Sequence, residues 1–93
     1  METIRQFKRM SLWDFIDLME ENCLNSGKAT TYFMYLDEIK MRRIESISEG
    51  GNVKLKKLAN QLLQTFKEEK NKDSEFCTDQ EFNDFVYTVQ NEI

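Results

Sequence analysis

Apolar residues between Val53 and Phe66 recur every three or four positions, a spacing that brings them to one face of an α-helix. The apolar positions are Leu55, Leu58, Ala59, Leu62, Leu63 and Phe66. Polar side chains fill the opposite face. This is the most regular helical pattern in the chain, so we expect the other helices to bury their own apolar faces against it.

Two further helices are predicted before this one. Ser11 is a suitable N-cap for a helix over about 12–24. Its inner face would be Leu12, Phe15, Ile16, Met19 and Cys23, and Gly27, in a turn-like stretch, would end the helix. A second helix over about 30–48 would turn inward Tyr32, Phe33, Leu36, Ile39, Ile44 and Ile47. Gly50 and Gly51 would stop it, and Asn52 would cap the helix over about 53–67.

The last helix begins at the clearest local signal in the chain. Thr78 is followed three residues later by Glu81, the spacing of a capping box, which predicts a helix over about 79–91. Its apolar stripe would be Phe82, Phe85, Val86, Val89 and Ile93. The stretch 67–75 is the most polar of the chain, so we expect a solvated linker there. The sequence thus predicts an all-α fold: a compact bundle of four helices in one domain, 1–93, with a short basic segment over 1–9.

Composition narrows the class of protein. The chain is 40% hydrophobic and 32% charged, which is typical of a globular domain. No apolar run approaches about 18 residues and no signal peptide is present, so we expect no membrane segment. Cys23 and Cys77 are far apart and have apolar neighbours. We therefore expect buried, reduced thiols and a cytoplasmic protein.

Common catalytic and metal-binding groups are missing. The chain has no histidine, which removes the commonest general base and the commonest metal ligand. Two distant cysteines fall short of the four ligands that zinc usually takes. The Gly50–Gly51 pair lacks the frame of a phosphate-binding loop. We therefore expect a protein that is not an enzyme and that carries no metal or cofactor.

Charge is segregated along the chain. The stretches 10–27 and 76–93 each hold four acidic residues and no basic one. Between residues 40 and 57, six basic residues outweigh two acidic ones. Large side chains also stand outside the clean apolar stripes, above all Trp13, Tyr35 and Met41. Aromatic residues and methionine are enriched at interface cores, and charge matching speeds encounter.

These features predict a small acidic helical protein that binds another protein with a basic surface, as an inhibitor or adaptor. The candidate contact residues are Trp13, Asp14, Asp17, Tyr35, Met41, Asp79, Asp84 and Glu92. By analogy of size and charge, the partner could be a nucleic-acid-binding enzyme whose basic channel is blocked, as phage-encoded inhibitors such as anti-CRISPR proteins do. The surplus apolar side chains of the helix over 30–48 could equally form a homodimer contact.

A DNA-binding regulator is the alternative. The helices over 30–48 and 53–67 would then form a helix-turn-helix, with the second helix in the major groove. Its candidate contact residues are Arg42, Arg43, Lys54, Lys57, Gln61 and Gln64. The two arginines would hold phosphates and the other four would read bases. The net charge of −4 makes nucleic acid the less favoured partner.

Overall fold

Four helices make up most of the structure. The computed structural model describes residues 10–22, 27–49 and 51–93, and for residues 44–49 the backbone alone. Within these ranges the helices are α2 (Leu12–Asn22), α3 (Ala29–Glu49), α4 (Asn52–Lys72) and α5 (Asp79–Asn91). The predicted all-α bundle is confirmed. The basic segment over 1–9 and Cys23 lie outside the described residues.

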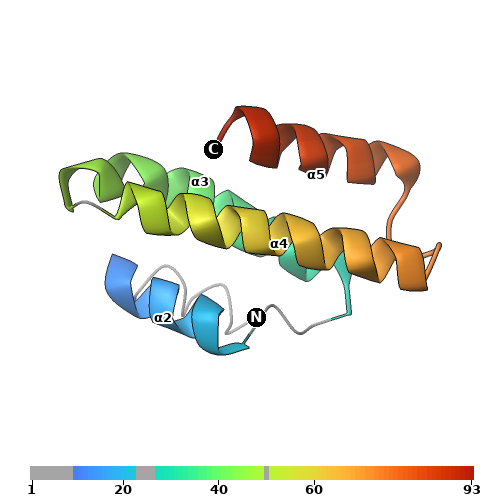
Figure 1. The fold of residues 1–93 in the computed structure, drawn as a ribbon, viewed down its shortest axis with the longest axis horizontal. Coiled ribbons are helices and arrows are strands. Elements are labelled where there is room, and N and C mark those ends of the chain that lie inside the picture. Colours follow the sequence, from blue (N-terminus) through green and yellow to red (C-terminus); the bar gives the residue numbers. More distant parts are fainter. Residues whose placement is uncertain (1–9, 23–26, 50) are drawn as a thin grey trace.

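Helix α4 is the centre of the arrangement. It runs side by side with α3 as an antiparallel pair, while α2 lies along one edge of the pair and α5 along the other (Figure 1). Each of the other three helices packs against α4. The buried residues of α4 are the six of the predicted stripe, Leu55, Leu58, Ala59, Leu62, Leu63 and Phe66. The expectation that the other helices bury their apolar faces on this one is confirmed.

The two edge helices begin at the predicted caps. The Asp14 backbone N–H donates to Ser11 Oγ over 3.2 Å, so Ser11 caps α2. At α5, the Glu81 N–H donates to Thr78 Oγ1 over 3.1 Å, and the Thr78 N–H donates to Glu81 Oε1 over 2.9 Å. This reciprocal pair is a complete capping box and satisfies two backbone donors at once.

Two details at the ends of α4 were predicted wrongly. Asn52 is the first helical residue, and Gly51 is the N-cap without a side-chain cap bond. The helix also continues to Lys72 instead of fraying at residue 67. The extra turn is held because Lys70 Nζ donates to the Cys77 carbonyl over 2.7 Å, and Lys70 and Lys72 lie in the last turn, where positive charge is favourable.

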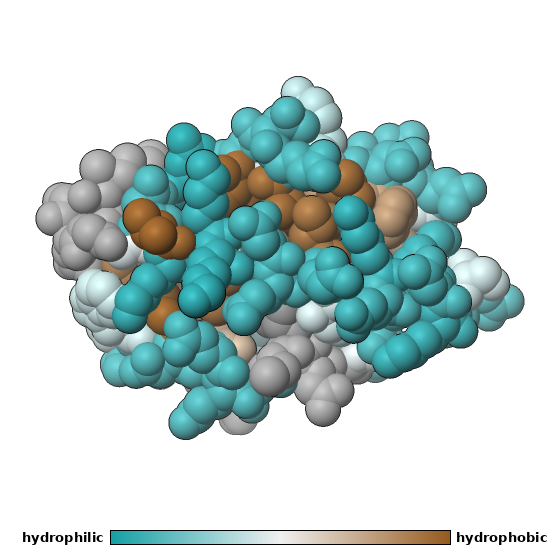
Figure 2. Space-filling view, viewed as in Figure 1, coloured by the Kyte–Doolittle hydropathy of each residue, from teal (hydrophilic) through white to brown (hydrophobic). Residues whose placement is uncertain are grey.

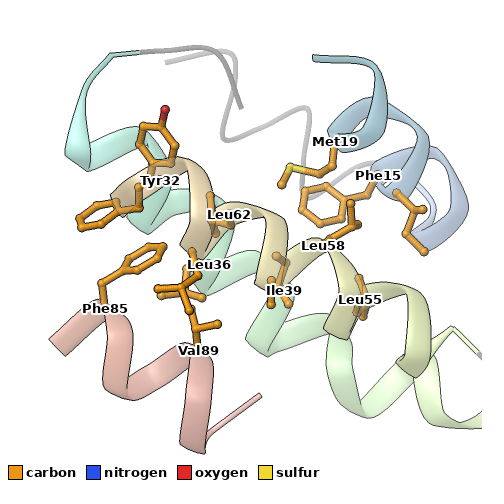
Figure 3. Close-up of a cluster of buried hydrophobic side chains, with 14 of the residues drawn as sticks. Phe15, Met19, Tyr32, Leu36, Ile39, Leu55, Leu58, Leu62, Phe85 and Val89 are labelled. Carbon is orange, nitrogen blue, oxygen red and sulfur yellow. The ribbon is translucent and has the colours of Figure 1, made fainter. Parts of the chain in front are cut away.

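An aromatic cluster fills the space between α3, α4 and α5. Its members are Tyr32, Phe33, Phe66, Phe76, Phe82 and Phe85. The Phe66 ring stacks on Phe85 at 4.0 Å between centroids and meets Tyr32 edge-on at 5.7 Å. Figure 3 shows Tyr32 and Phe85 on the α5 side of the core and Phe15 and Met19 on the α2 side. Edge-to-face and stacked pairs add stability beyond area burial.

A buried ion pair occupies the region between α2 and α3. Arg42 Nε donates to Glu38 Oε1 over 2.7 Å, and Arg42 Nη2 donates to the Met10 carbonyl over 2.8 Å. The guanidinium carbon lies 5.0 Å from the centre of the Phe15 ring. Arg42 is only 7% exposed. It therefore links α3 to the segment that leads into α2.

Candidate functional site

The outer face of α2 is acidic and carries an exposed tryptophan. Trp13, Asp17 and Glu20 follow each other at helical spacing, and Asp14 and Glu21 flank them; all five are exposed. Trp13 is 42% exposed. Among the described residues, no ion pair involves Asp14, Asp17 or Glu21. We call this face, together with the adjoining outer face of α4, the α2 edge.

Helix α4 contributes polar side chains to the same edge. Lys54 Nζ lies 5.0 Å from the centre of the Trp13 ring, within the range of a cation–π contact. Further along, a hollow of about 220 Å³ opens between α2 and α4. Its lining residues are Met19, Glu20, Leu58, Gln61, Gln64, Thr65 and Glu68. Residues predicted for two rival partners, Trp13 for protein and Lys54 for DNA, are therefore in direct contact.

The second acidic helix, α5, differs from α2 because its carboxylates form ion pairs and hydrogen bonds with neighbouring side chains. Asp79 pairs with Lys70 and Glu92 with Lys40, each at 3.4 Å, and Asp84 accepts a 2.8 Å hydrogen bond from Gln80. Tyr87 stands on this helix and is 60% exposed. It was not among the predicted contact residues. Its position outside the stripe Phe82, Phe85, Val86 and Val89 is the signal that could have identified it.

The two remaining predicted contact residues, Tyr35 and Met41, lie on α3 and not on α2 or α5. The Tyr35 side chain is half-buried, its ring centre 6.4 Å from that of Phe15, and burial raises its pKa. Met41 is 65% exposed, but on α3. Since α2 and α5 lie at opposite edges in Figure 1, the eight predicted contact residues do not form one surface. Trp13, Asp14 and Asp17 lie together on α2.

The structure corrects the predicted role of Arg42. A phosphate contact requires an accessible guanidinium, whereas Arg42 is buried against Glu38 and Phe15. Arg43 is exposed and donates to the Glu92 backbone carbonyl. On α4, Lys57 is exposed, while Gln61 and Gln64 line the hollow beside α2. Helices α3 and α4 also run antiparallel, whereas those of a helix-turn-helix cross at about 90–120°.

Neither the thiol nor the acidic residues assemble into a reactive or metal-binding group within the described part of the chain. Cys77 is buried, and burial raises the pKa of its thiol, a change that the nearby Lys70 partly opposes. A raised pKa keeps the thiol protonated and unreactive near neutral pH. In the described residues, no group of three or more cysteine, aspartate or glutamate side chains could hold a metal ion.

The candidate site is identified from the structure alone. Over the residues that the structure describes, no helix has the length and apolarity of a membrane span. A scan against protein-family models, a search of curated proteins and a search of solved structures found no match. Three features of the α2 edge make it the candidate functional site: the exposed Trp13, the acidic helix face and the hollow.

Proposed function

We propose that this chain binds a protein with a basic surface through the α2 edge and acts as an inhibitor or adaptor without catalysis of its own. The observation that carries the proposal is the outer face of α2, where Trp13 is exposed beside Asp14, Asp17 and Glu21 and these carboxylates form no ion pair with another described residue. Trp is the residue type most enriched among binding hot spots.

The charge of α2 favours a basic partner. Residues 10–27 contain four acidic residues and no basic one, and Lys54 lies against Trp13 on the same face. A basic partner would be steered toward this face, and the effect would weaken with salt over a Debye length of about 8–10 Å. Contacts that lie at a rim change association rate more than affinity, whereas a tryptophan that becomes buried contributes to affinity.

The same geometry supports DNA binding less well than protein binding. The helix that would enter the major groove has α2 packed alongside it, and two of its four predicted base readers, Gln61 and Gln64, line the hollow between the two helices. Arg42 is engaged inside the protein. Those α4 residues would approach DNA together with the four acidic residues of α2, which the phosphates repel.

The small size and acidic charge of the chain also predict the class of partner. Blocking of the basic channel of a nucleic-acid-binding enzyme, as in the anti-CRISPR class of phage proteins, is one form that the proposed inhibition could take. A cytoplasmic location and a homodimer through α3 are expected on sequence grounds. The half-buried Met34 and the exposed Met41 are the apolar side chains that such a dimer would cover.

The test is affinity capture from a native lysate, with and without nuclease, read by mass spectrometry. We expect one protein in near-equal amount, unaffected by nuclease. Asp17→Lys with Glu21→Lys should lower its recovery at least about tenfold, because two attractions become repulsions. The changes should leave the fold intact, since both side chains are exposed and lysine near the C-terminal end of α2 suits the helix dipole.

A matched control has the same change of charge on the other edge. Asp84→Lys with Glu92→Lys alters two exposed residues of the α5 region. We expect this variant to keep most of the captured protein. Equal capture by wild type and the α2 variant would overturn the proposed edge. Recovery that collapses with nuclease would move the assignment to nucleic acid, and a captured copy of the chain itself would indicate the homodimer.

A further inference from the structure

The hollow between α2 and α4 has the size of a site for one side chain. At about 220 Å³ it is smaller than the roughly 300–1,000 Å³ of pockets for drug-sized ligands. It is larger than the ~150 Å³ cavity that holds a single benzene. Its volume suits one long amino-acid side chain.

Its lining is apolar at the base and acidic at the rim. Met19 and Leu58 are each 2% exposed, and they lie between α2 and α4 (Figure 3). The exposed members are Glu20, Gln61, Gln64 and Glu68. Gln64 Nε2 donates to Glu68 Oε1 over 3.3 Å, which orients that carboxylate. Among the described residues, the lining contains two carboxylates and no lysine or arginine.

We propose that this hollow receives an arginine side chain of the protein partner, an inference that rests on the proposed function. The aliphatic stem would pack on Met19 and Leu58, and the guanidinium would meet the Glu68 carboxylate at the rim. An apolar stem with a cationic head is the shape that such a lining complements. Arginine fits better than lysine because its planar fork matches carboxylates, and because arginine is enriched at interfaces whereas lysine is depleted.

The position of the hollow agrees with a protein partner. Glu20 lies three residues from Asp17 and seven from Trp13, so the three fall on one side of α2 and one basic surface laid along the helix would reach them all. In the view of Figure 2 the most extensive apolar area lies elsewhere, between α4 and α5. Binding along α2 would therefore combine the Trp13 contact, charge matching and one inserted side chain.

The test uses capped arginine, N-acetyl-arginine methylamide, as the probe on the full chain. Methyl signals of Met19 and Leu58 are followed by NMR during titration. We expect weak, saturable shifts at these two residues. Capped norleucine, which has an apolar stem without the cation, should bind at least several-fold more weakly.

Three variants sharpen the titration. Glu68→Gln should weaken binding of capped arginine about two- to fivefold, the range for an exposed ion pair. Glu75→Gln, the same change in the loop after α4, should leave it unaltered. Gln64→Lys places a competing cation at the rim and should weaken binding at least tenfold. All three positions are exposed, so the fold should be retained, as checked by circular dichroism.

Each outcome decides the proposal. Absent or unsaturated shifts at Met19 overturn the site, and equal binding of norleucine overturns the role of charge. Agmatine that binds ten times more tightly than capped arginine would assign the hollow to a free amine and overturn the side-chain proposal. Capture of a protein that is unaffected by Gln64→Lys would separate the hollow from the proposed function. Saturable arginine binding without any captured protein would refute the function alone.

Discussion

The two flanks of helix α4 are built differently. On the α5 side, five aromatic rings surround Phe66, and the acidic residues at both ends of α5 pair with lysines of α3 and α4. On the α2 side, the core ends in a buried Arg42–Glu38 pair and a hollow, and the outer carboxylates of Asp14 and Asp17 pair with no other described residue. The α5 flank therefore holds most of the aromatic packing, and the α2 flank holds the carboxylates and the hollow on which the proposed contact rests.

The largest expected effect is on the aromatic flank. Phe66→Ala should lower the free energy of unfolding by about 3–5 kcal/mol, because the ring is fully buried and stacks on Phe85. Urea denaturation followed by circular dichroism measures the loss. Tyr87→Ala is the control, since it removes an exposed aromatic side chain of the same flank and should cost less than about 0.5 kcal/mol. A loss below about 1 kcal/mol for Phe66→Ala would show that the cluster is not central.

The buried pair of the α2 flank gives a second test. Arg42→Met leaves the Glu38 carboxylate buried without its partner, so we expect a loss of about 3–5 kcal/mol. Adding Glu38→Leu removes the orphaned charge and should recover most of that loss. The exposed Arg43→Met is the control and should cost less than about 1 kcal/mol. Additive losses in the double variant would mean that the two side chains act independently.

Helix caps allow a matched comparison of the flanks. Thr78→Ala removes one half of a reciprocal capping box at α5, and Ser11→Ala removes a single cap bond at α2. We expect about 1 kcal/mol for each, with the larger loss at Thr78. Hydrogen exchange should increase within 79–91 for the first variant and within 12–22 for the second. Faster exchange spread evenly over both helices would contradict the separation of the flanks.

The smallest effect concerns Cys77, which lies beside the aromatic flank. Burial raises the pKa of its thiol in the folded chain. The stability that the protonated Cys77 thiol contributes to the folded chain is therefore fully present below the ordinary thiol pKa of about 8.5. It declines as the pH rises through the raised pKa of the folded state. The stability difference between wild type and Cys77→Ala should accordingly shrink at alkaline pH.

Thiol labelling gives an independent reading of Cys77. In a Cys23→Ser background, the native thiol should react at least about tenfold more slowly than a free thiol at pH 7. Denaturant should restore the normal rate, which serves as the control. Fast labelling of the native protein would place Cys77 at the surface.

Local signals in the sequence predicted much of the fold. The spacing of Leu55, Leu58, Leu62 and Phe66 located the central stripe, and Ser11 and Thr78 located two helix starts, because these depend on neighbours within one or two turns. The end of α4 was misplaced because Lys70 is held by Cys77, seven residues away across a turn. Such a contact leaves no periodic trace.

The candidate site was harder to predict for a related reason. Trp13 and the acidic face of α2 were identified from composition and spacing, yet the contact between Trp13 and Lys54 joins residues far apart in the chain. The burial of Arg42 was missed, although Glu38 precedes it by four residues, a spacing that favours an ion pair. Whether such a pair faces solvent or the core depends on which helices pack around it.

The most direct test of the α2 edge is hydrogen exchange of the chain, free and in complex with the captured partner. We predict added protection over 12–22 on α2 and over 61–68 on α4, with 79–91 on α5 unchanged. Protection confined to α5, with exchange over α2 unaltered, would contradict the account and assign the contact to the opposite flank.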